Sequence, residues 1–239
     1  MPGPGDFRVH GYLPNSFCVT KKKLIHFQEN LTFPFLFQLK YIELQKGFSL
    51  KGCWNENFFG NENPLILELG CGKGEYTVGL AQAYPEKNFI GIDIKGARLW
   101  RGCRTVKDKN LGNVAFIRSM VDQIESYFSP GEVSEIWITF PDPQPGKERK
   151  RLSCPRFLEI YRKIMNPDGI IHLKTDEREF YNYTLGVIRD HGLKPGFATD
   201  DLYHSDHSAI TDDVIKVRTY YENIWLDLGK KICYLRFCL

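Results

Sequence analysis

From residue 64 to its end, the chain alternates short apolar runs with amphipathic segments, and this alternation limits the fold more than any other feature of the sequence. We expect strands at 65–69, 88–92, 113–117, 135–139 and 169–174, helices at 75–84, 95–108, 155–164 and 180–188, and one further strand at 231–237. Strands and helices in alternation predict an α/β fold with a mostly parallel twisted sheet and helices on both faces. We expect the late strand to run antiparallel.

The first quarter of the chain lacks this alternation. Residues 1–23 are rich in proline and glycine, and we expect them to form a disordered N-terminal tail. Residues 24–63 are irregular and rich in aromatic side chains, which predicts an extension packed on the main domain at 64–239. A chain of 239 residues, 42% hydrophobic and 26% charged, suits one such domain with a short extension.

The composition disfavours membrane, disulfide-rich and metal-binding proteins. No apolar run approaches the ~20 residues of a membrane span, and the N-terminus lacks a signal-peptide pattern, so we expect a cytoplasmic protein with no membrane partner. The seven cysteines include no Cys-x-x-Cys pair, which favours reduced thiols. His204 and His207 fit a solvated loop as well as a metal site, and we predict no metal.

A glycine-rich motif follows the first strand and opens the first helix, where a nucleotide-binding loop belongs. It contains Glu68, Gly70, Gly72 and Gly74, and Asp93 ends the next strand, where a carboxylate can accept hydrogen bonds from ribose hydroxyls. A dinucleotide would bring its pyrophosphate close to Glu68, which is repulsive, whereas the ammonium and sulfonium of S-adenosylmethionine are attracted to a carboxylate. The motif therefore favours S-adenosylmethionine as the cofactor over NAD, and over a glycine turn beside a solvated acid.

The strand at 135–139 ends in Phe-Pro-Asp-Pro, and the two prolines stiffen the turn that holds Asp142. Four basic residues follow in one short loop: Lys147, Arg149, Lys150 and Arg151. A second basic group shares one face of the helix at 95–108: Arg98, Arg101 and Arg104. A fixed carboxylate beside clustered cations suits a nucleobase on a phosphate backbone, although solvated charge runs would give the same pattern. The net charge of +3 is too small to decide between them.

Four blocks of the sequence, in this order, resemble the signature blocks of the bacterial tRNA (guanine-N7-)-methyltransferase (TrmB) family. They are Phe140-Pro141-Asp142-Pro143, Lys150-Arg151-Leu152, Lys174-Thr175-Asp176 and Thr219-Tyr220-Tyr221-Glu222. The resemblance covers roughly residues 60–239. It implies a Rossmann-like class I methyltransferase fold, with tRNA as the partner and S-adenosyl-L-methionine as the methyl donor. The implied reaction is transfer of a methyl group to N7 of the guanosine at position 46 in the variable loop of tRNA.

The resemblance also implies roles for individual residues. Glu68, Asp93 and Asp142 match acids on the cofactor side, and Asp142 also matches the catalytic position. Asp176 and the stretch from Thr219 to Glu222 match the site for tRNA or guanine. From the residues alone, Asp176 fits a helix N-cap, and Thr219 and Glu222 fit a surface turn, equally well.

The chain departs from the family pattern at three places. Met120 lies where the fold contacts adenine, and an Asn or Asp is usual there; we expect Met120 to pack against the ring. Gln144 stands where Trp is usual. The basic loop is about two residues shorter than the family's, which usually has a lysine near Gly146, and we take Lys147 as its substitute in substrate binding.

The implied reaction makes modest chemical demands. Guanine N7 carries a lone pair and no proton, so its methylation needs alignment with the methyl group rather than a general base. Guanine also presents N1–H and an amino group as donors, which carboxylates such as Asp142, Asp176 or Glu222 can accept. We expect the target base to leave its stack to reach the pocket.

Two other functions stay open on the sequence. One is a class I methyltransferase that acts on a small molecule or a protein, and the basic loop disfavours it, because a small neutral substrate gains nothing from four nearby cations. The other is a non-catalytic RNA-binding protein of the same fold, which the intact acids and glycine loop disfavour. The sequence leaves open a monomer or a homodimer.

Overall fold

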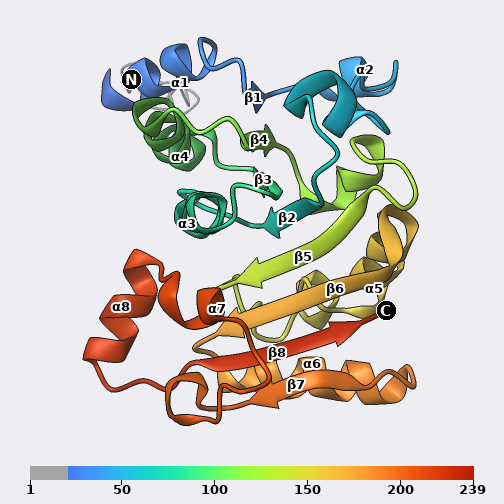
Figure 1. The fold of residues 1–239 in the computed structure, drawn as a ribbon, viewed down its shortest axis with the longest axis vertical. Helices are drawn as coiled ribbons and strands as arrows, with labels where there is room; N and C mark the ends of the chain where they lie inside the picture. Colours follow the sequence, from blue (N-terminus) through green and yellow to red (C-terminus); the bar gives the residue numbers. More distant parts are fainter. Residues whose placement is uncertain (1–20) are drawn as a thin grey trace, which may run out of the picture.

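The apolar runs of the sequence become the strands of one sheet in residues 21–239, the part of the chain that the computed structural model describes (Figure 1). Within this part the sheet has eight strands in the order β1-β4-β3-β2-β5-β6-β8-β7. The strands are β1 (Leu36–Phe37), β2 (Leu65–Leu69), β3 (Asn88–Asp93), β4 (Val114–Arg118), β5 (Val133–Thr139), β6 (Met165–Thr175), β7 (Pro195–Thr199) and β8 (Cys233–Cys238). β1 to β6 pair in parallel, and β8 runs antiparallel to both of its neighbours. The predicted mostly parallel α/β fold with a late antiparallel strand is confirmed.

The strand order creates a crevice at the carboxyl ends of β2 and β5. β2 pairs with β3 on one side and with β5 on the other, so the chain runs outward from β2 through β3 and β4 and then returns to β5 in the other half of the sheet. In open α/β sheets, ligands bind at such a switch point. The topology therefore selects this edge of the sheet before any side chain is considered.

Helices cover both faces of the sheet. They are α1 (Lys21–Asn30), α2 (Tyr41–Leu44), α3 (Glu75–Ala83), α4 (Gly96–Lys109), α5 (Pro155–Ile164), α6 (Arg178–Asp190), α7 (Asp212–Lys216) and α8 (Tyr220–Asp227), with short helical turns η1 (Asn55–Phe59), η2 (Val121–Ser126), η3 (Glu148–Lys150) and η4 (Leu202–His204). Side chains alternate along β2, so that Leu65 and Leu67 pack with α5 and α6, whereas Ile66 packs with α3 and α4. None of these helices is long and apolar enough to cross a membrane.

The aromatic extension is part of the core. β1 pairs with β4 and so lengthens the sheet, and Trp54 is fully buried against Phe48 and Phe128. The indole N–H of Trp54 donates to the carbonyl of Tyr127 at 3.0 Å. The aromatic residues therefore gather around Trp54 because each ring buries a large apolar area next to the main domain.

The structure differs from the sequence prediction in four places. Residues 21–23, which we assigned to the tail, begin α1, and residues 1–20 lie outside the described part. The strand predicted at 169–174 begins earlier, at Met165, with an irregularity where the pairing shifts from Val133–Met165 to Glu135–Ile170. β7 was not predicted, because its residues are mostly exposed and form no apolar run. α7 and α8 were not predicted either, and Figure 1 shows them at the ends of β5 and β6.

Replacing Trp54 by alanine tests the role of the extension. Because Trp54 is fully buried, we expect Trp54→Ala to lower the free energy of unfolding by about 3–5 kcal/mol. Tyr41→Ala, in the same segment but 63% exposed, should change it by less than about 0.5 kcal/mol. Urea unfolding followed by tryptophan fluorescence and circular dichroism measures both. Equal effects of the two substitutions would show that the extension does not contribute to the core.

Candidate active site

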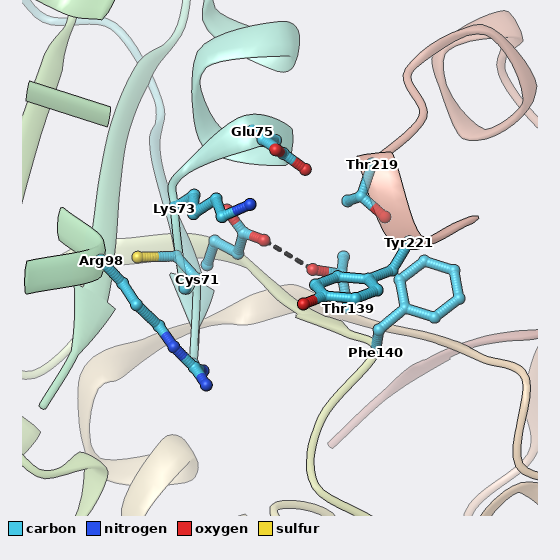
Figure 2. Close-up of a pocket in the computed structure, with 11 residues that line it drawn as sticks. Cys71, Lys73, Glu75, Arg98, Thr139, Phe140, Thr219 and Tyr221 are labelled. Carbon is cyan, nitrogen blue, oxygen red and sulfur yellow. Dashed lines mark hydrogen bonds between the residues drawn. The ribbon is translucent and has the colours of Figure 1, made fainter. Parts of the chain in front are cut away.

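A cavity of about 160 Å³ lies at the switch point of the sheet (Figure 2). The loop after β2, the end of β5 and the start of α8 form its walls. Its lining residues are Glu68, Gly70, Cys71, Gly72, Lys73, Glu75, Arg98, Thr139, Phe140, Thr219 and Tyr221. Of the residues predicted for the site, Glu68, Gly70, Gly72 and Thr219 therefore share one cavity. In Figure 2, Arg98 and Cys71 lie on one side of it, and Thr219, Tyr221 and Phe140 on the other.

The glycines of the loop have two different physical roles. Gly70, Gly72 and Gly74 have φ of 73°, 57° and 68°, a left-handed conformation that other residues rarely adopt. No atom beyond the adjacent chain lies within 4 Å of a Cβ built on Gly72, so the backbone there is open to a ligand. A Cβ on Gly74 would lie 2.7 Å from the ring of Phe116. Gly74 thus allows α3 to approach the sheet, and it does not line the cavity.

Glu68 is buried and holds three elements together. Its Oε1 accepts a hydrogen bond from Thr139 Oγ1 at the end of β5, at 2.5 Å, and its Oε2 accepts from the backbone N–H and the hydroxyl of Thr77 in α3. Burial raises the pKa of Glu68 to about 7, against these hydrogen bonds, which lower it. Near neutral pH the carboxyl is therefore poised between its neutral and charged forms.

Asp93 supports the glycine loop from the neighbouring strand. Its Oδ2 accepts from the backbone N–H of Gly72 at 2.9 Å, and its Oδ1 accepts from that of Lys95 at 2.6 Å. The side chain lies outside the cavity lining but joins the loop to the start of α4. Met120, after β4, is 47% exposed and makes the first residue of the turn into η2.

The loop after β5 is bent and anchored. Phe140 and Gln144 both have positive φ, 46° and 48°, which is uncommon for residues other than glycine and is found mainly at functional sites. Asp142, between them, is exposed, and its Oδ1 accepts from the backbone N–H of Gln144 at 3.1 Å. The turn therefore presents the carboxylate to solvent, two residues after Phe140 of the cavity wall and outside the lining itself.

The basic loop divides into exposed and buried members. Lys147, Arg149 and Lys150 are exposed. Arg151 is only 2% exposed: its Nε donates to the carbonyl of Pro143 at 3.0 Å, and its guanidinium pairs with Glu179 and lies over the ring of Tyr183. We counted Arg151 among the cations available to RNA, and this was wrong, because its charge is used to anchor the Asp142 loop.

The three arginines on one face of α4 have different surroundings. Arg104 pairs with Glu29 of α1 at 2.6 Å, which occupies its charge within the protein. Arg101 is exposed, and Arg98 lines the cavity. The three arginines therefore do not form a shared phosphate-binding surface.

The acids in the last two blocks of the family resemblance do not line the cavity. Thr219 lines the cavity, but Glu222 is fully buried and pairs with Lys174 at 2.6 Å. Asp176 lies apart from both and pairs with Lys230 at 3.0 Å, and it does not cap α6, whose N-cap is Glu177. The sequence suggested that Glu222 faces the substrate, whereas the structure buries it outside the cavity lining.

Sequence reasoning missed several residues of the site. Thr77 and Thr139, which hold Glu68, were not singled out, nor were Phe140 and Tyr221 as residues of the cavity wall. Lys174 carried a signal, because it is a lysine near the end of a mostly apolar run, and a charge buried there needs a buried partner. No group of three His, Cys, Asp or Glu side chains that could hold a metal ion occurs within residues 21–239.

The strand order, the glycine loop and the acid at the end of β3 define a Rossmann-like methyltransferase. A family model described as "Putative methyltransferase" matches residues 62–235. Two relatives, each named tRNA (guanine-N(7)-)-methyltransferase, are similar over most of their length. The one from Christiangramia forsetii is 50% identical over 221 residues, covering 91% of this chain and 98% of the relative, and the one from Bacteroides thetaiotaomicron is 48% identical over 220 residues, covering 92% and 86%. The chain belongs to the tRNA (guanine-N(7)-)-methyltransferase family.

A solved structure supports the fold. The crystal structure of the 16S rRNA methyltransferase KamB has a TM-score of 0.59 with this chain, and the match covers 77% of this chain and 91% of that one. The sequences are 11% identical, so the likeness concerns the fold alone.

The pKa of Glu68 predicts how stability depends on pH. The folded protein holds the Glu68 proton up to pH about 7, whereas the unfolded chain releases it near the ordinary value of 4.5. Raising the pH through this window therefore favours unfolding, by up to about 3 kcal/mol from this group. We expect the free energy of unfolding of the wild type, measured by urea titration, to fall between pH 4.5 and 7 relative to that of Glu68→Gln.

The comparison with Glu68→Gln cancels the other titrating groups, which both proteins share. Parallel stability profiles of the two proteins across this pH range would contradict a raised pKa at Glu68.

Proposed function

We propose that the protein transfers a methyl group from S-adenosylmethionine to N7 of a guanosine in tRNA, at position 46 of the variable loop. The observation that carries this proposal is the meeting of the glycine loop, the Asp142 loop and Thr219 at one cavity, in a chain whose similar relatives bear that enzyme name. The Glu68–Thr139 hydrogen bond joins the proposed cofactor side to the proposed substrate side.

The residues present fit the methionine end of the cofactor. The cavity, at about 160 Å³, is smaller than the roughly 300–1,000 Å³ of most small-molecule sites, so we place only this end inside it. Glu68 lies in its wall, where an ammonium would favour the charged carboxylate. When bound, S-adenosylmethionine supplies an electrophilic methyl group on a sulfonium.

The adenosine end would lie outside the cavity, along Asp93 and Met120. Each oxygen of Asp93 accepts one backbone hydrogen bond and can accept one more, which suits the two ribose hydroxyls. Met120, half-exposed after β4, offers an apolar surface for adenine. Gly72, with open space above its Cα, allows the cofactor to approach the backbone.

The substrate side combines an aromatic wall with exposed charges. Figure 2 shows the rings of Phe140 and Tyr221 near each other on one side of the cavity, and flat apolar faces of this kind stack on bases that have left a helix. Asp142 is exposed two residues after Phe140 of the cavity wall, and its carboxylate can accept from the N1–H or amino group of guanine. Lys147, exposed in the next loop, suits contact with RNA phosphates.

The reaction needs these groups to position the two reactants, and none of them has to transfer a proton. The lone pair of N7 forms the new bond to the methyl carbon while the bond from that carbon to sulfur breaks, and no proton leaves N7. The protein's contribution is therefore to align the two partners and to exclude other acceptors.

Transfer of a labelled methyl group to unmodified tRNA, followed by separation of the nucleosides, tests this function. We expect label in 7-methylguanosine, and none when the guanosine at position 46 is replaced by adenosine. Asp142→Asn should lower kcat/KM about a hundredfold without changing the melting temperature, because the turn is held by other contacts.

Glu148→Gln is the matched control, since Glu148 is an exposed acid of the neighbouring loop, and it should keep wild-type activity. Label in another nucleoside would contradict the assignment of guanosine N7 as the methylated atom. Full activity of Asp142→Asn would contradict the role assigned to Asp142. Cofactor binding without labelled RNA would favour a different substrate class.

A further inference from the structure

The segment from α7 to the start of α8 is tied to the sheet by one buried lysine. Lys174 Nζ, near the end of β6, lies 2.6 Å from Glu222 Oε1, and both side chains are fully buried. The same Nζ donates to the carbonyl of Val214 at 2.7 Å and to that of Val217 at 3.4 Å. An ammonium has three donors, so these three acceptors use all of them.

Glu222 is equally occupied within the protein. Its Oε1 also accepts from the hydroxyl of Tyr203 at 2.6 Å, and its Oε2 accepts from the backbone N–H of Thr219 at 3.3 Å. In return, Thr219 Oγ1 accepts from the backbone N–H of Glu222 at 3.1 Å, which completes a capping box at the start of α8. No oxygen of Glu222 is turned toward the cavity, whereas Thr219 and Tyr221 both line it.

Opening this pair to let Glu222 bind guanine would be costly. Removing one partner of a buried ion pair leaves a charge without compensation, which is strongly destabilising. Glu222 could reach a base only if Lys174 stayed buried and unpaired among the rings of Tyr76 and Tyr203, 5.3 and 5.8 Å from its Nζ.

We propose that Glu222 and Lys174 are positioning residues, and that Glu222 does not contact guanine. This proposal rests on the proposed function. Their ion pair holds the segment 214–222 against the end of β6, so that Thr219 and Tyr221 form one wall of the cavity opposite the glycine loop (Figure 2). The hydroxyl of Thr219 accepts within the capping box and keeps its own hydrogen to donate to an acceptor in the cavity.

A double-mutant cycle separates positioning from contact with the base. The four proteins are the wild type, Lys174→Met, Glu222→Gln and the double variant. Glutamine can keep the capping box, and methionine matches the length of the lysine stem. If the two residues act through one pair, the second change costs little once the first has been made, whereas two independent roles give losses that multiply.

We expect each single variant to lower kcat/KM at least tenfold and to lower the melting temperature. The double variant should be no more than about threefold less active than the worse single variant, because both changes remove the same pair. Trp54→Phe is the control for destabilisation alone: remote from the cavity, it should lower the melting temperature and leave kcat/KM unchanged at a temperature where it is folded. A folded double variant whose loss of kcat/KM equals the product of the two single losses would overturn the proposal, and so would a Glu222→Gln enzyme with wild-type kinetics.

A second measurement does not depend on the folding of the double variant. Inosine at the target position lacks the amino group of guanine. A side chain that accepts a hydrogen bond from this group therefore raises the ratio of kcat/KM for the guanosine tRNA to kcat/KM for the inosine tRNA. If Glu222 only positions the wall, this ratio should be the same in the wild type and in Glu222→Gln, within about threefold. A ratio at least tenfold lower in Glu222→Gln would show that Glu222 accepts from guanine.

Failure of the proposed function is distinct from either result. A wild-type protein that transfers no methyl group to tRNA would overturn the function itself, and the positioning role with it. An active wild type in which the two single losses multiply in the double variant would overturn the positioning role alone.

Discussion

The carboxyl group of Glu68 is the contact on which the site depends. It receives hydrogen bonds from α3 through Thr77 and from the end of β5 through Thr139, so one side chain of β2 fixes the glycine loop, the helix behind it and the strand that leads to Asp142. β2 and β5 are neighbours only because the strand order reverses between them. The topology thus brings the glycine loop and the Asp142 loop together, and the Glu68–Thr139 hydrogen bond joins the two strands that carry them.

Two buried cationic side chains hold the loops around the cavity. Arg151 holds the carbonyl of Pro143 and so fixes the Asp142 loop, and Lys174 holds the start of α8 through Glu222. Arg151 and Lys174 both belong to sequence blocks that resemble the family, yet both side chains are buried. Residues shared by a family around an active site can therefore serve the shape of the site as well as its contacts with substrate.

The sequence predicted the parts of the site that depend on local pattern. The strand, glycine turn and helix of the loop, and Asp93 at the end of the next strand, follow from periodicity and spacing, and the structure places them side by side. Burial that depends on distant residues was not predictable in this way. From the sequence we grouped Arg151 with the cations available to RNA, because nothing nearby in the chain reveals that Tyr183 and Glu179 contact it. β1 has only two residues and β7 no apolar run, so neither gave a signal of periodicity.

The most direct test of the account is the number of protons released when the cofactor site is filled. S-adenosylhomocysteine carries the same amino-acid end as the methyl donor, and its ammonium should drive Glu68 into the charged form. With a pKa of about 7 in the free protein, Glu68 is about half protonated at pH 7, so calorimetry in buffers of different ionisation enthalpy should detect release of about half a proton per ligand. Glu68→Gln should release none from this group. Equal proton release by the two proteins would contradict the placement of the cofactor's ammonium beside Glu68.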